Sequence, residues 1–170
     1  MYWQKKYDYV KCKNIQMISD TTMRKAFRYN YSEALFLEEV VFPTFRADII
    51  EFREIDNNKV VIGYELKSDR DSTDRLEQQL RGYLTYCNYV FVLCTRLNYR
   101  DILKILNVPE FERVGLRLYE MTDIGNFFNS KRKAKYKDLR GEGLTMDWIT
   151  NNNKLSLWDY WLQEAWGLGI

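Results

Sequence analysis

The stretch that decides the fold is residues 46–67, which read RADIIEFREIDNNKVVIGYELK. The segment 46–55 alternates between two faces, as a strand does. The segment 56–58 is an Asp-Asn-Asn run that favours a tight turn. The segment 59–67 is rich in β-branched residues and predicts the returning strand of a hairpin.

Further elements follow on both sides of this hairpin. Residues 20–42 lack proline and glycine, and Ser32 stands as a helix cap, so we expect one or two helices that end near Pro43. Downstream we expect a helix over 73–87, a strand over 89–94, a helix over 99–106, a strand over 114–121, another strand around 125–128, and a helix over 155–166. The pattern predicts an α/β fold with a central mixed sheet of four or five strands flanked by helices.

Length and composition point to one domain. The 170 residues are 46% hydrophobic, enough for a sizeable core. We expect a core over about 20–121, followed over 122–170 by a basic segment and a C-terminal helix in which Trp158, Trp161 and Trp166 pack inward or form a dimer seam. No apolar run approaches the ~20 residues that span a bilayer. No apolar stretch follows the first lysines, so we expect neither a membrane segment nor a secretory signal, and a cytoplasmic location.

The residue types present narrow the chemistry. The chain has no histidine, which excludes Ser-His-Asp and Cys-His catalysis and histidine-ligated zinc. Its cysteines, Cys12, Cys87 and Cys94, lack metal-type spacing and are expected to be buried thiols. An enzyme of this composition works with carboxylates, lysines and a hard cation.

Asp48, Glu65 and Lys67 form the one constellation with such chemistry. Alternation along the second strand puts Glu65 and Lys67 on one side and Leu66 in the core. A carboxylate and a lysine two residues apart are more often a surface charge pair. The added aspartate on the preceding strand makes this a candidate site for a divalent cation with oxygen ligands.

The segments around these residues resemble small bacterial and phage proteins of the PD-(D/E)XK nuclease superfamily. The resemblance covers about residues 32–121 and is most specific over 65–83, which read ELKSDRDSTDRLEQQLRGY. It implies a restriction-endonuclease-like core. The proline that names the superfamily is replaced by Ala47.

The resemblance also implies roles. Asp48, Glu65 and the carbonyl of Leu66 would hold Mg²⁺, for which Mn²⁺ can substitute. Lys67 would orient or deprotonate the attacking water, and Gln79 would lie near the site and touch phosphate or substrate. Glu39 would be the helix-borne acid of the first motif and would bind a second metal or a metal-bound water, although the adjacent Glu38 is an alternative and only one of the two can face the site.

Basic and aromatic residues supply candidates for DNA contact. Arg70, Arg75 and Arg81 lie beside the proposed site, although Arg75 with Asp71 is equally a helix-surface ion pair. Tyr83 and its neighbours at 86 and 89 are either base-stacking residues or, more commonly, core. The segment 131–140 is either a solvated face or a phosphate-tracking stretch, and its candidate contacts are Lys131, Arg132, Lys133 and Lys135.

The resulting hypothesis is a Mg²⁺-dependent endo- or exodeoxyribonuclease that hydrolyses DNA phosphodiester bonds and recognises DNA structure or ends rather than sequence. The alternative is a non-catalytic DNA-binding or partner-binding module on the same fold, such as a phage accessory protein. RNA as the substrate stays open. A homodimer or a partner protein is compatible with either function.

Overall fold

The computed structural model describes residues 16–139, and within them a single mixed sheet organises the chain. The elements in chain order are α2 (Asp20–Asn30), β1 (Leu35–Val41), β2 (Arg46–Ile55), β3 (Asn58–Lys67), α3 (Leu76–Tyr86), β4 (Tyr89–Cys94), α4 (Arg96–Leu106), a 3₁₀ turn (Pro109–Phe111), β5 (Val114–Thr122) and β6 (Gly125–Arg132). The α/β class is confirmed, but this sheet has six strands in the order β1-β2-β3-β4-β5-β6, so the predicted four or five strands were too few.

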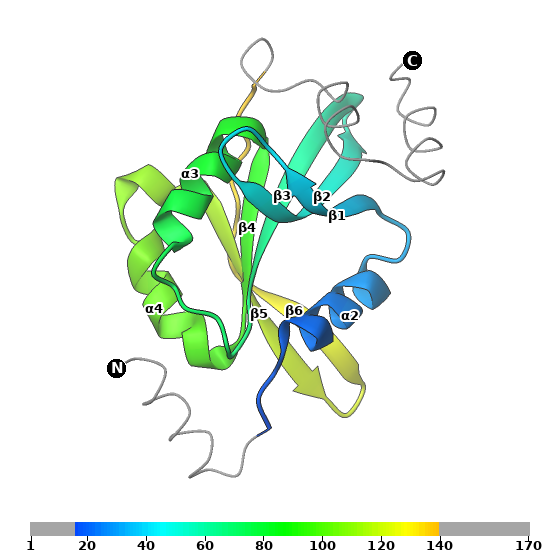
Figure 1. The fold of residues 1–170 in the computed structure, drawn as a ribbon. Helices are drawn as coiled ribbons and strands as arrows, with labels where there is room; N and C mark the ends of the chain where they lie inside the picture. The colour runs from blue at the N-terminus through cyan, green and yellow to red at the C-terminus, as the bar shows by residue number, and fades with distance from the viewer. Residues whose placement is uncertain (1–15, 140–170) are drawn as a thin grey trace.

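Helices cover both faces of the sheet (Figure 1). Leu80 and Tyr83 of α3 and Ile102 of α4 belong to one core cluster. Met23 and Phe27 of α2 belong to a second cluster with Ile49 and other side chains of the opposite face. The sheet is therefore the middle layer of three. No helix within residues 16–139 is long and apolar enough to cross a membrane.

The β2–β3 hairpin forms as predicted. Its turn residues Asp56 and Asn57 both have positive φ, at 50° and 62°, which Asp and Asn tolerate better than other side chains. The antiparallel register pairs Ile49 with Tyr64 and Ile50 with Gly63. Carried one residue further, this register sets Asp48 opposite Glu65.

The prediction that helix continues over 33–42 was wrong. α2 ends at Asn30, and Leu35–Val41 instead forms the edge strand β1, antiparallel to β2. Ser32 caps no helix; the cap that exists is Ser19, whose hydroxyl accepts a hydrogen bond from the Thr22 amide at the start of α2. Leucine and glutamate favour a helix locally, but pairing with β2 and burial of Leu37 and Val40 outweigh that propensity.

Downstream of the hairpin the predictions hold, with shifted boundaries. α3 begins at Leu76 rather than Thr73, α4 begins at Arg96 rather than Tyr99, and β6 extends to Arg132. β4 lies between β3 and β5, parallel to both, which explains its continuous apolar run. Cys87 and Cys94 are free and buried, as expected. Cys12 and the predicted C-terminal helix lie outside the described residues.

A substitution in α2 tests how firmly this helix belongs to the core. Phe27 is 0% exposed and stacks on Tyr31 with ring centroids 4.2 Å apart. We expect Phe27→Ala to lower the free energy of unfolding by about 3–5 kcal/mol, because it removes a large buried ring. Tyr29→Ala on the same helix, where the side chain is 81% exposed, should change it little. Urea unfolding measures both, and equal losses would contradict the assignment of α2 to the core.

Candidate active site

Three carboxylates lie in one row across the first three strands. The pairs Glu38–Ile49 and Val40–Ala47 set Glu39 opposite Asp48, just as the β2–β3 register sets Asp48 opposite Glu65. Asp48 and Glu65 are in contact through their side chains. The structure therefore brings together the acids that the sequence analysis singled out.

Lys67 lies beside this row and is also buried. Its Nζ is 3.3 Å from Glu65 Oε1 and donates a hydrogen bond of 2.9 Å to Gln79 Oε1 on α3. Lys67 is 6% exposed and Glu65 2% exposed, so this is not the surface charge pair that a carboxylate and a lysine usually form. Gln79, predicted near the site, contacts it through Lys67.

Tyr83 joins the Asp48 backbone to the Glu65 carboxylate. Its hydroxyl accepts a hydrogen bond from the Asp48 amide at 2.8 Å and lies 2.8 Å from Glu65 Oε2 and 2.9 Å from the Tyr64 carbonyl oxygen, either of which can accept its proton. The ring approaches β3 closely because residue 63 is glycine: a Cβ there would lie 2.4 Å from Tyr83 Cδ1. Tyr83 is 0% exposed, so stacking on a base is excluded in this conformation.

Glu39 is not borne on a helix, and that part of the prediction was wrong. It lies on β1 with a φ of 54°, and it lines the cleft, whereas Glu38 does not. Glu38 instead pairs with Arg28 at 2.9 Å. The helix does contribute an acid to the cleft, but that acid is Asp20 of α2.

Arg24 of α2 reaches into the same cluster. Its Nη2 lies 2.6 Å from Glu39 Oε1 and 3.3 Å from Asp48 Oδ1, and its Nε lies 2.7 Å from Asp20 Oδ2. Arg46 adds a second cation on Glu39 at 2.9 Å. The acids on the outer side of the row are thus neutralised by arginines.

These side chains line one cleft of about 500 Å³. Its floor is formed by Asp48, Glu65, Leu66 and Lys67, and its walls by Asp20, Arg24, Glu39, Thr44, Phe45, Arg46, Asp71, Arg75, Gln78 and Gln79. The cleft lies at the carboxyl end of β3, where α2, β1 and α3 approach one another.

Burial of the two central carboxyls changes their acidity. Burial, and after it the charge of Asp48, raises the pKa of Glu65 from its ordinary 4.5 to about 8. Burial also raises the pKa of Asp48, against the lowering effects of the Leu66 amide, which donates to Asp48 Oδ2 at 2.8 Å, and of Arg24. At neutral pH the pair therefore retains a proton unless another cation takes its place.

The two central carboxylates of the cleft are few for a metal ion held by protein ligands alone. Within residues 16–139 no group of three or more His, Cys, Asp or Glu side chains is arranged to hold a metal ion. Two touching carboxylates of raised pKa and the adjacent Leu66 peptide nevertheless suit an ion that uses one or two carboxylates and keeps several waters. The donor set fits Mg²⁺ rather than a fully protein-ligated metal.

The predicted DNA-contact residues do not all lie at this cleft. Arg75 lines it, whereas Arg70 is exposed on the loop after β3. Arg81 is turned toward Glu110, with Nε 2.6 Å from Oε1. Asp71 accepts a hydrogen bond from the Ser68 amide at 2.7 Å, which accounts for it without the proposed ion pair to Arg75.

The basic segment lies toward the opposite end of the parallel strands. The amides of Lys135 and Lys137 donate to the carbonyl oxygens of Arg113 and Asn88, which precede β5 and β4. Arg132 is occupied by the carbonyl oxygens of Leu106 and Phe111, at 2.7 and 2.9 Å. Lys131 and Lys133 are exposed. This segment and the cleft are not brought together.

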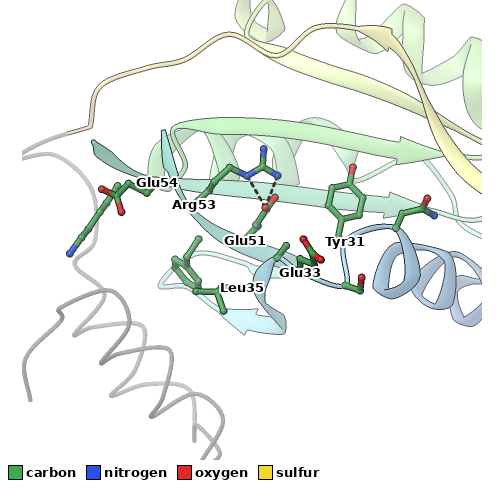
Figure 2. A pocket seen from close by; sticks show the side chains of 11 residues that line it. Tyr31, Glu33, Leu35, Glu51, Arg53 and Glu54 are labelled. Atoms are coloured by element: carbon green, nitrogen blue, oxygen red, sulfur yellow. Dashed lines mark hydrogen bonds and ion pairs between the residues drawn. The ribbon is translucent and has the colours of Figure 1, made fainter. Parts of the chain in front are cut away.

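A second pocket, of about 610 Å³, lies over the α2–β1 turn and the outer half of β2. Figure 2 shows its acid, Glu51, facing Arg53, with Tyr31, Glu33 and Leu35 around them. Glu51 is 1% exposed, accepts from Tyr64 Oη at 2.6 Å, and pairs with Arg53 Nη2 at 2.6 Å. Glu51 is the one buried acid among the residues that line this pocket, whereas the first cleft brings the acids Asp48 and Glu65 together, so the first cleft is the better candidate for chemistry.

Sequence reasoning missed Arg24 and Asp20 as site residues, and it placed Tyr83 in the core without its hydrogen bond to Glu65. Asp20 and Arg24 do carry a signal, since they are four apart on a predicted helix, but nothing local says which way that face points. The Gly63–Tyr83 contact joins a strand to a helix and has no local signature.

Comparisons with known proteins give one family and one structural neighbour. The family described as bacteriophage P4 protein cII matches over residues 12–159. No curated protein matches the chain significantly. A solved structure of the SPO1766 protein of unknown function from Silicibacter pomeroyi is 16% identical, with a TM-score of 0.44, and the alignment covers 67% of this chain and 68% of that chain.

The buried pair predicts a pH dependence of stability. Between pH 4.5 and about 8 the folded protein keeps a proton on Glu65 that the unfolded chain has released. The resulting stabilisation is complete below the lower value and is lost as the pH rises to the upper one. In EDTA, we expect the urea midpoint to fall across this range in the wild type and to fall less in Glu65→Gln.

Glu54→Gln is the matched control, because this exposed acid lies on β2 outside the cleft. It should keep the wild-type slope. A Glu65→Gln variant with an undiminished slope would contradict the retained proton.

Proposed function

The chain belongs to the bacteriophage P4 protein cII family, and on the chemistry of its cleft we propose that it is a Mg²⁺-dependent nuclease acting on DNA. The observation that carries the proposal is the buried contact between Asp48 and Glu65, with Lys67 and Gln79 beside it. A restriction-endonuclease-like core is part of the same proposal.

A structural role explains this arrangement poorly. Two touching carboxyls of raised pKa store unfavourable energy in the folded state whenever the pH or a ligand ionises them. An apolar pair of similar size would avoid that cost. A cation bound by both acids offsets it, which gives the arrangement a use.

Asp48, Glu65 and the Leu66 carbonyl would hold the ion. When bound, Mg²⁺ supplies Lewis-acid polarisation of a phosphoryl oxygen and stabilisation of the leaving oxygen. Lys67, held by Gln79, would orient the attacking water and stabilise the negative charge that develops as the water loses its proton. Arg75, on the cleft wall and exposed, is free to contact a neighbouring phosphate.

DNA is proposed as the substrate, with the basic segment as a second contact. The basic segment contacts the start of β3 through Asn88, which bonds to both Val61 and the Lys137 carbonyl oxygen. Lys67 at the cleft lies six residues further along β3, a distance of about 20 Å. That length corresponds to roughly six nucleotides of stacked DNA. Contacts to the DNA phosphate backbone at both the cleft and the basic segment would favour recognition of DNA by its shape and charge rather than by its sequence.

Cleavage assays test the proposal directly. We expect wild type to cut labelled single-stranded, duplex, flap or four-way-junction DNA in Mg²⁺ or Mn²⁺. Asp48→Ala should abolish cleavage, and Lys67→Ala should slow it by about 100-fold or more, because each removes a group that acts on the reacting phosphate. Mg²⁺ should also raise the Tm of wild type and not of Asp48→Ala.

Glu54→Ala, an exposed acid on the same strand as Asp48, is the control and should cut like wild type. DNA binding without cleavage and without a Mg²⁺ effect on Tm would replace the nuclease with a binding module. Cleavage of RNA alone would change the substrate and keep the chemistry.

A further inference from the structure

All three guanidinium nitrogens of Arg24 donate hydrogen bonds to groups of the protein. Nε donates to Asp20 at 2.7 Å, Nη1 to Glu38 at 3.3 Å and to the Asp48 carbonyl oxygen at 3.4 Å, and Nη2 to Glu39 at 2.6 Å and to Asp48 Oδ1 at 3.3 Å. A guanidinium has five N–H donors, and each of them is engaged. Arg24 therefore has no donor left for a phosphate in this arrangement.

The Arg24 guanidinium lies at one end of the row of three acids. It bridges Glu39 and Asp48, the outer two of the three acids in the row. Asp48 in turn touches Glu65, so Asp48 lies between a fixed cation on one side and the proposed metal ligands on the other. The two acids that a second divalent ion would need to share, Glu39 and Asp48, are thus already bridged by a cation.

α2 is built so that Arg24 stays there. Met23 and Phe27 on either side of it are 0% exposed. The chain entering the helix is joined to the loop after β3, since the Ile18 amide donates to Asp69 Oδ2 at 2.7 Å and the Asp69 amide donates to the Ile18 carbonyl oxygen at 3.0 Å. The Arg24 side chain is only 11% exposed.

The charges around the cleft leave room for one divalent ion. Of the ion-paired side chains that line the cleft, four are carboxylates, Asp20, Glu39, Asp48 and Glu65, and three are cationic, Arg24, Arg46 and Lys67. With all of them ionised, one divalent ion already reverses the sign of the cluster. A second would meet net repulsion at short range.

We propose that Arg24 is a fixed cation that takes the place of a second metal ion between Glu39 and Asp48. The protein therefore binds a single divalent cation. This inference rests on the proposed function, which supplies the first cation. Arg24 is a positioning residue: it holds Asp48 and Glu39 in place and does not touch the substrate.

Isothermal titration calorimetry of the full chain with Mn²⁺ tests the inference without any cleavage assay. We expect one cation per chain in wild type and one more in Arg24→Met, whose neutral side chain leaves Glu39 and Asp48 without their shared guanidinium. Arg28→Met is the matched control one turn along α2; its partner Glu38 does not line the cleft, so its cation number should equal that of wild type.

Unfolding in EDTA and in Mn²⁺ gives a second readout that survives poor folding of the variant. Mn²⁺ should raise the midpoint of Arg24→Met more than that of wild type, and Arg24→Lys, which keeps a positive charge, should behave like wild type. An unchanged cation number and an unchanged Mn²⁺ effect in Arg24→Met would overturn the inference, as would an equal gain in Arg28→Met.

The two proposals fail in different ways. A gain of one site in Arg24→Met over a wild type that binds one cation supports the role of Arg24, and a wild type that already binds two would overturn it. A wild type that binds one cation and gains a second in Arg24→Met, but cuts no DNA, counts against the nuclease alone.

Discussion

The contact between the Asp48 and Glu65 carboxyls is the constraint on which the rest of this structure depends. Antiparallel pairing of β2 with β3 sets the two acids opposite each other, and burial keeps water from separating their charges. Their surroundings compensate in specific ways. The Leu66 amide donates to Asp48, Lys67 pairs with Glu65, and the Tyr83 hydroxyl lies against both strands. Gly63 follows from the same need, because a larger residue there would displace the Tyr83 ring from β3.

The two faces of the sheet contribute different things to this site. The α3 face supplies rigid support, since Tyr83 is fully buried and Gln79 fixes the Lys67 ammonium. The α2 face supplies charge, since Arg24 enters the acidic row from a helix whose apolar side chains pack under β2 and β3. A change that loosens α2 therefore alters the electrostatics of the cleft, whereas a change in α3 alters its geometry.

The sequence predicted the centre of the fold better than its edge, for a physical reason. Residues 46–67 and 89–94 carry their pattern locally, because strands buried on one or both faces must show it. Leu35–Val41 contains residues that favour a helix, and only pairing with β2 makes it a strand. Asp48, Glu65 and Lys67 were predictable because adjacent strands hold them, whereas Gln79 was implied by the resemblance to the nuclease superfamily. Arg24 and Tyr83 were not predictable, because their partners are distant in the chain.

The ion pairs also bear on whether the acidic row is a binding site or a structural feature. Glu39 is partnered twice by arginines, and Glu38 likewise, so these acids are neutralised without any ligand. Asp48 and Glu65 are balanced less fully, since one lysine and a share of one arginine face two carboxyls, of which Glu65 is 2% and Asp48 23% exposed. The unbalanced charge is thus concentrated at one point of the cleft, directly beside the ammonium of Lys67. A purely structural role does not explain a local excess of negative charge at this point. A phosphodiester-cleaving site does, because it needs a cation there and a lysine next to it.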